Sequence, residues 1–144
     1  SALVEFENGV RGTLETCRAI YGPKCEMAFE VNGDRGAAKW NFEQMNELDL
    51  YLPGEDGLHD GYTRLLGGPR YPFHGRFNPG DGIGMGYEDL KAIEAYHFLL
   101  SVIDGVQRAP SFADALALAG VQTAMMRSWE SGQWESVPDL RRTS

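Results

Sequence analysis

The sequence is poor in basic residues. Thirteen lysines and arginines stand against 21 aspartates and glutamates, which leaves a formal net charge of −8. Nucleic acids and anionic membranes are bound mainly through clustered lysines and arginines, and the dense basic pair Arg141-Arg142 lies in a polar C-terminal stretch. We therefore expect neither a nucleic-acid partner nor a membrane partner.

Long apolar runs are missing as well. No stretch of the sequence approaches the ~20 residues of a transmembrane helix, and no secretory signal pattern is present, so we expect a cytoplasmic protein. Ser1-Ala2 leads straight into a predicted strand without a starting methionine. The chain is therefore expected to be processed or to be a piece of a longer protein.

Cysteine is represented by Cys17 and Cys25, on either side of a predicted turn at Tyr21-Gly22-Pro23. A disulfide across that turn is geometrically conceivable. The small number of cysteines and the expected reducing compartment favour two free thiols.

The sequence lacks the common metal, nucleotide and catalytic motifs. The histidines, His59, His74 and His97, do not have metal-ligand spacing, although a loop histidine is suited to lining a pocket for a polar substrate. The glycine-rich stretch 80–86 has neither the G-x-G-x-x-G fingerprint nor a P-loop lysine. A Ser-His-Asp order, a nucleophile elbow and a framed carboxylate pair are also missing. We expect no metal, no cofactor and no catalytic residue in this chain.

What the sequence does contain is an alternation of apolar and polar residues between Leu3 and Leu52. A period of two predicts half-buried strands, and their close succession predicts an antiparallel meander. The alternating apolar positions are Cys25, Met27, Phe29, Val31, Ala38, Trp40, Phe42, Leu48, Leu50 and Leu52.

Asn8-Gly9 predicts a hairpin near the start of this meander. A simple two-residue loop would pair Val4 with Thr13 and mix apolar and polar side chains on one face. A bulge at Gly9 would shift the register by one residue and set Val4 and Phe6 beside Val10, Gly12 and Leu14. The second strand carries apolar residues on both sides, so a sheet covered on both faces, by helices and by a second subunit, is the alternative.

The second half of the chain predicts an ordered loop followed by two helices. Residues 53–86 are rich in glycine and proline, and their aromatic residues favour an ordered excursion over one end of the sheet. The apolar spacing predicts a helix from Tyr87 to Asp104. A second helix is expected to begin at Ser111, with a capping box to Asp114, and to run to about Ser131.

These elements predict an α+β fold: a large, mostly antiparallel, open-faced sheet with two C-terminal helices packed on one face. A chain of 144 residues fits one domain. We assign residues 1–140 to that domain and 141–144 to a polar tail.

A group of phenolic and cationic residues is suited to a polyhydroxylated ligand, because they combine hydrogen-bond donors with flat apolar faces. They gather at one turn, in the long loop and at one helix start: Tyr21, Lys24, Arg64, Tyr71, Arg76 and Tyr87.

The order and spacing of several segments resemble the C-terminal domain of the glucose–fructose oxidoreductase / inositol dehydrogenase / MocA family. The residues that carry the resemblance are 2–12, 29–37, the run from Tyr87-Glu88 through residues 98–105 into 110–115, and 128–134. Residues 78–88 are similar to a loop of one subgroup, which usually has histidine where Asp81 stands, and this departure leaves the substrate subgroup open.

The resemblance implies a two-domain NAD- or NADP-dependent dehydrogenase that acts on a secondary alcohol of a sugar, cyclitol or related polyol. The cofactor and the catalytic residues would belong to a missing nucleotide-binding domain, so this chain alone is expected to be inactive. It further implies a homo-oligomer, a dimer or tetramer, formed through the sheet face.

By analogy with the family, Tyr21, Lys24 and Tyr87 are expected to border the substrate, and we add His74 and Arg76 from their place in the loop. The alternative function is a non-catalytic β-sheet domain used for dimerisation or sugar binding.

Overall fold

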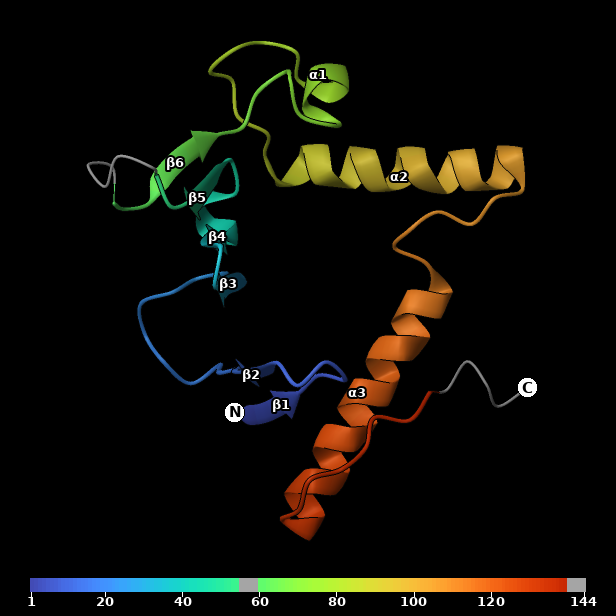
Figure 1. Cartoon of the computed structure of the whole chain (residues 1–144). Coiled ribbons are helices and arrows are strands. Elements are labelled where there is room, and N and C mark those ends of the chain that lie inside the picture. Colours follow the sequence, from blue (N-terminus) through green and yellow to red (C-terminus); the bar gives the residue numbers. More distant parts are fainter. Residues whose placement is uncertain (55–59, 140–144) are drawn as a thin grey trace. The chain divides into compact units, whose positions relative to one another are not determined.

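A computed structural model describes residues 1–54 and 60–139, and it divides the chain into two compact units (Figure 1). One unit comprises Ser1–Ala19 and Phe98–Ser144, and the other comprises Ile20–His97. His59 and the polar tail 141–144 lie outside the described residues.

The first unit opens with a hairpin of β1 (Ala2–Glu5) and β2 (Arg11–Leu14). Val4 lies opposite Gly12, and Glu5 lies opposite Arg11, with which it forms an ion pair of 2.9 Å. Gly9 has φ +81°, and its N–H donates to the Phe6 carbonyl. The bulged register is therefore confirmed, because glycine adopts the positive φ that the extra residue requires.

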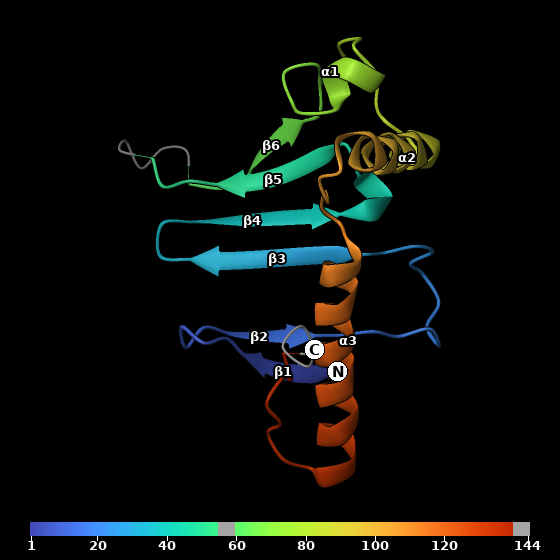
Figure 2. The same ribbon diagram turned by 90° about the vertical axis from the view of Figure 1, so that its right-hand side faces the viewer.

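The same unit contains α3 (Phe112–Ser131), which confirms the expected second helix. Ser111 and Asp114 form the capping box, and Gly132 ends the helix with φ +66°. Gly120 and Ala124 are its buried residues among those described, and they lie one turn apart on one face. The helix runs beside the β1–β2 hairpin in both views (Figures 1 and 2).

The second unit is built on an antiparallel sheet in the order β3-β4-β5-β6 (Figure 2). Its strands are β3 (Ala28–Gly33), β4 (Gly36–Asn41), β5 (Glu47–Tyr51) and β6 (Thr63–Leu66). A short 3-10 helix, η1 (Phe42–Gln44), connects β4 with β5. The antiparallel α+β class is thus confirmed.

Three details differ from the sequence-based expectation. The second strand ends at Leu14, and the strands form a two-stranded and a four-stranded sheet, because residues 15–27 leave strand geometry and include Gly22 at φ +118°. The loop 53–86 contains a strand, β6, and a short helix, α1 (His74–Phe77). Both are too short to produce a periodic sequence pattern.

α2 (Tyr87–Asp104) begins where it was expected, and Gly105 follows it at φ +65°. Asp89 accepts a hydrogen bond from the N–H of Gly86 at 2.7 Å and, with Glu88, places negative charge in the first turn. Among the described residues, no helix combines the length and apolarity needed to cross a membrane.

Candidate functional site

A row of alternating charges crosses one face of the four-stranded sheet. Glu30, Lys39, Asp49 and Arg64 are direct cross-strand neighbours on β3, β4, β5 and β6. Lys39 pairs with Glu30 at 3.2 Å, and Arg64 pairs with Asp49 at 3.0 Å and with Glu47 at 3.1 Å. The period of two therefore separates this polar face from an apolar face that carries Trp40, Leu48 and Leu65.

Local contacts tune the charges in this row. Hydrogen bonds from Asn32 and then Lys39 hold the pKa of the Glu30 carboxyl below its ordinary value. The Glu30 carboxylate in turn raises the pKa of Lys39, whose Nζ lies 4.6 Å from the ring centre of Tyr62. Both side chains thus remain charged at neutral pH.

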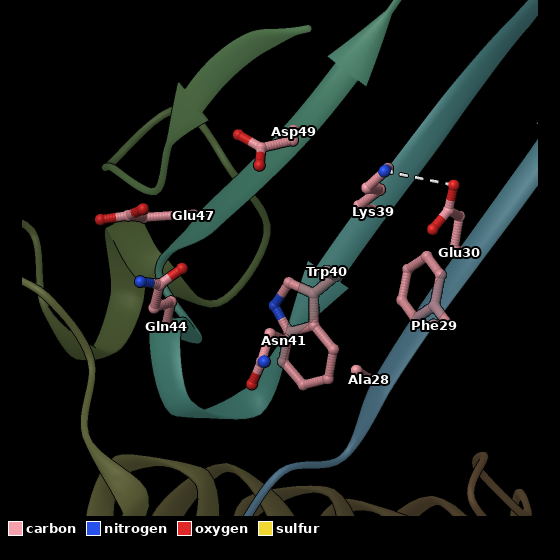
Figure 3. A pocket seen from close by; sticks show the side chains of 9 residues that line it. All are labelled: Ala28, Phe29, Glu30, Lys39, Trp40, Asn41, Gln44, Glu47 and Asp49. Atoms are coloured by element: carbon pink, nitrogen blue, oxygen red, sulfur yellow. Dashed lines mark ion pairs between the residues drawn. The ribbon is translucent and has the colours of Figure 1, made fainter. Parts of the chain in front are cut away.

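Two shallow hollows border the sheet. The first, about 340 Å³, is lined by a mixture of charged, amide and aromatic residues (Figure 3): Ala28, Phe29, Glu30, Lys39, Trp40, Asn41, Gln44, Glu47 and Asp49. The second, about 440 Å³, is more apolar and reaches Tyr71, His74 and Met85. Neither hollow contains Tyr21, Lys24, Arg76 or Tyr87 in its lining.

The η1 corner, which we define as residues Phe42–Asn46, holds the turn that carries Lys24. The Oε1 atom of Glu43 accepts hydrogen bonds from the backbone N–H groups of Lys24 at 2.6 Å and Cys25 at 2.8 Å. These two bonds, led by that from Cys25, lower the pKa of the Glu43 carboxyl. The turn is otherwise open, and the Tyr21 side chain is fully exposed.

The same corner holds the start of α2. The ring of Phe42 meets the ring of Tyr87 edge-on at 6.4 Å. Asn46 Nδ2 donates to the Met85 carbonyl at 2.8 Å, and its Oδ1 accepts from the Met85 N–H at 2.7 Å. Since Met85 lies two residues before Tyr87, the corner brings the predicted residues Lys24 and Tyr87 to the same end of the sheet.

His74 is buried, whereas a residue that contacts a ligand directly is expected to be exposed. Its side chain is 3% exposed, and Nε2 lies 3.0 Å from the carbonyl oxygen of Ile83. A Cβ added to Gly67 would lie 3.0 Å from the His74 ring, so the glycine makes room for it. These contacts tie α1 to the loop that precedes α2.

Arg76 is separated from the η1 corner. Its Nη1 donates to the Tyr96 hydroxyl at 3.2 Å, and Tyr96 is nine residues, or about 13 Å, along α2 from Tyr87. His97, one position further on, packs against Phe73 with ring centres 5.0 Å apart. Arg76 therefore belongs to an aromatic cluster between α1 and α2.

The residues that sequence reasoning missed are the ones that connect these segments. Glu43 and Asn46 make contacts 19 and 39 residues away along the chain. No sequence pattern distinguishes a polar residue that bonds to a distant segment from any other polar residue after a strand. The short polar connection between two clearly predicted strands does indicate where the corner lies.

The glycine-rich stretch 80–86 differs from a dinucleotide-binding turn, in which glycines between a strand and a helix leave backbone N–H groups open to phosphate. The glycine-rich stretch 80–86 follows α1 instead of a strand, and side chains occupy its backbone groups: Asn78 donates to the Gly84 carbonyl at 2.8 Å, and Asn46 pairs with Met85. Among the described residues, no group of three or more potential ligands is arranged to hold a metal ion. Cys17 and Cys25 are free and exposed.

The fold and the corner together define an α+β domain that gathers polar and aromatic residues at one end of its four-stranded sheet. Residues 1–137 match the family model described as "Oxidoreductase family, C-terminal alpha/beta domain". The chain belongs to this family.

The chain is similar to levoglucosan dehydrogenase from Pseudarthrobacter phenanthrenivorans, with 29% identity over 138 residues that cover 96% of the chain and 35% of the relative. It is similar to the structure of a levoglucosan dehydrogenase complex with NADH and levoglucosan, with a TM-score of 0.90, 29% identity and coverage of 96% and 38% of the two chains. An oxidoreductase domain protein from Kribbella flavida gives a TM-score of 0.85, 31% identity and coverage of 94% and 35%. The chain thus spans about a third of the length of the relatives that it matches.

Proposed function

We propose that residues 1–140 form the substrate-side domain of a dehydrogenase that transfers hydride between NAD or NADP and a secondary alcohol of a sugar, cyclitol or related polyol. The observation that carries this proposal is the similarity over 96% of the chain to a structure described as a complex with NADH and levoglucosan. The dinucleotide is held by a nucleotide-binding domain outside this chain, in keeping with the poor fit of stretch 80–86.

The η1 corner supports a sugar-binding role at one end of the sheet. Lys24 lies in an exposed turn whose backbone is held by Glu43, and we place its ammonium group beside the ligand. Tyr87 is 55% exposed while its ring is held against Phe42. An ammonium and a phenol near one aromatic edge suit a ligand with several hydroxyl groups, and Tyr21 adds a second exposed phenol.

The remaining predicted residues take supporting places in this proposal. Arg76 is held by the Tyr96 hydroxyl in the cluster between α1 and α2, away from the η1 corner, and His74 contributes by holding α1 to the Ile83 carbonyl.

The experiment is a steady-state assay of the full-length dehydrogenase that carries this chain, with levoglucosan and a panel of polyols. We expect NAD- or NADP-dependent oxidation, and about a tenfold higher KM for the sugar in Lys24→Met and Tyr87→Phe, because each removes about one hydrogen bond to the ligand. Arg35→Met is the matched control, since Arg35 is exposed in the β3–β4 turn at the other end of the sheet. A full-length protein that oxidises no polyol with NAD or NADP would contradict the proposed function, and an unchanged sugar KM in both site variants would contradict the place of Lys24 and Tyr87 in the site.

The isolated chain is expected to bind no NADH and to turn over no sugar. A fluorescence titration with NADH tests this, and nanomolar affinity for the isolated chain would contradict the placing of the cofactor in another domain. A sheet domain that binds sugar without any nicotinamide chemistry in the full-length protein would support the non-catalytic alternative.

The polar sheet face supports the proposed homo-oligomer. Its row of Glu30, Lys39, Asp49 and Arg64 alternates in sign from β3 to β6. A two-fold axis parallel to the strands reverses the row, which sets Glu30 over Arg64 and Lys39 over Asp49 of a second copy. Because an isologous contact must be self-complementary, this alternation fits a dimer formed face to face through the polar side.

A further inference from the structure

We infer that Asn46 is a positioning residue: its side chain sets the place of Tyr87 by holding the backbone of Met85. The inference rests on the proposed sugar site and adds the device that assembles it. The side chain of Asn46 is bonded to the backbone of Met85, so its effect on Tyr87 passes through the loop before α2.

The Asn46 side-chain amide bonds to Met85 as the backbone of a neighbouring strand would, with one donated and one accepted hydrogen bond. The Asn46 amide donates to the Met85 carbonyl at 2.8 Å and accepts from the Met85 N–H at 2.7 Å, so both backbone groups of one residue are satisfied by one side chain. The Asn46 backbone carbonyl also accepts from the Gly67 N–H at 2.7 Å. One residue therefore links β5, the end of β6 and the approach to α2.

The surroundings make this contact specific for an amide. A Cβ added to Gly84 would lie 2.8 Å from Asn46 Nδ2, so glycine is needed for the close approach. Asn46 and Met85 are both half-buried, and bonds partly shielded from water lose more when one partner is removed. Only a group that donates and accepts at once satisfies Met85.

The consequence for the site follows from chain geometry. Two residues separate Met85 from Tyr87, and the first turn of α2 begins at Tyr87. The edge-on contact with Phe42, at 6.4 Å, needs the start of α2 to be held at the corner. If Asn46 releases Met85, the phenol of Tyr87 loses its fixed place while the rest of α2 keeps its own hydrogen bonds.

The test compares Asn46→Asp with the wild type in the full-length dehydrogenase. An ionised carboxylate still accepts from the Met85 N–H but repels its carbonyl, whereas a protonated carboxyl donates as the amide does. The facing Met85 carbonyl disfavours the ionised form and so raises the pKa of the new carboxyl above that of a free aspartate. We expect the sugar KM of Asn46→Asp to be about tenfold above wild type at pH 8 and to fall toward the wild-type value, measured at each pH, as the pH drops through about 5 and below. The kcat and the affinity for NADH are expected to stay within about twofold, because the proton-dependent loss concerns only the sugar site.

Two further variants separate positioning from misfolding. Gly84→Ala forces the Asn46 amide away from Met85 and should raise the sugar KM without the pH-dependent recovery. Gly68→Ala, in open space with no atom within 4 Å of the added Cβ, should leave the KM unchanged. Faster amide exchange at Met85 in Gly84→Ala, where the acceptor of its N–H is displaced, gives a readout that does not depend on activity.

The outcomes are distinct. A wild-type enzyme that oxidises no sugar or polyol defeats the proposed function and the inference with it. Two outcomes overturn the positioning role and leave the proposed function standing. In the first, the wild type is active and Asn46→Asp leaves the sugar KM unchanged. In the second, Asn46→Asp loses NADH affinity and sugar affinity together at every pH.

Discussion

At the scale of single residues, the two polar side chains of the η1 corner act on backbone groups of distant segments. Glu43 accepts from two successive N–H groups, and Asn46 pairs with both groups of Met85. Carboxylates that accept several backbone bonds are held in the charged form, which accounts for the lowered pKa of Glu43. The two corner side chains thereby fix the backbone of the segments that carry Lys24 and Tyr87.

A pH dependence follows for Glu43. Its pKa is lower in the folded chain than the ordinary value of 4.5, so its stabilising effect is complete above that value and is lost as the pH falls through the folded-state pKa. At pH 7 we expect the Lys24 and Cys25 amides to exchange roughly fivefold faster in Glu43→Gln than in the wild type, because a charged acceptor is about twice as strong as a neutral one.

Hydrogen exchange followed by NMR at several pH values measures this ratio. It should approach one in acid, where the wild-type carboxyl is protonated. Glu94→Gln, which removes one charge from an exposed pair with Lys91, is the matched control and should leave both amides unchanged. A ratio for Glu43→Gln that does not vary with pH would show that the carboxylate charge has no part in holding the turn.

At the scale of the elements, what could be predicted from the sequence was local. The hairpin follows from Asn8-Gly9, with its bulged register as one of the alternatives, and the bounds of α2 and α3 follow from apolar spacing and caps such as Ser111 and Gly132. The short elements β6 and α1 escaped prediction, since β6 exists through pairing with β5 and through Arg64 reaching Asp49. Of the site, residue types at Lys24 and Tyr87 were visible, but the long-range contacts of the corner were not.

The cap of α3 gives a prediction for stability. Ser111→Ala removes the acceptor for the Asp114 N–H and the hydroxyl that donates to the Asp114 carboxylate. We expect a loss of about 1 kcal/mol in the free energy of unfolding, measured by urea unfolding followed by far-UV circular dichroism. Ser111→Thr keeps a hydroxyl that both accepts from the Asp114 N–H and donates to its carboxylate, and it should recover most of the loss; a full loss in both variants would contradict a capping role.

At the scale of the whole molecule, the chain supplies a sheet with one charged and one apolar face. Exposed ion pairs contribute little to the stability of a single chain. The charged row of Glu30, Lys39, Asp49 and Arg64 can therefore form contacts with a second copy at little cost to the stability of each chain. Electrostatic complementarity mainly determines which partner is chosen and in which orientation.

This gives a charge-swap prediction for the proposed dimer. Lys39→Asp sets Asp49 of one copy against an acidic residue of the other, and Asp49→Lys sets two basic residues together, so each variant alone should associate at least tenfold more weakly. A mixture of the two variants restores both opposite-charge contacts and should form heterodimers. Analytical ultracentrifugation reads the result, and equal association of the single variants and the mixture would exclude the two-fold arrangement proposed for this face.

The most direct measurement is a crystal structure of the full-length protein with NADH and levoglucosan. We expect the sugar to contact the Lys24 ammonium and the Tyr87 hydroxyl beside the η1 corner, with the nicotinamide held by residues outside this chain. A sugar that touches neither side chain, or a dinucleotide lying on residues 80–86, would contradict the central claim.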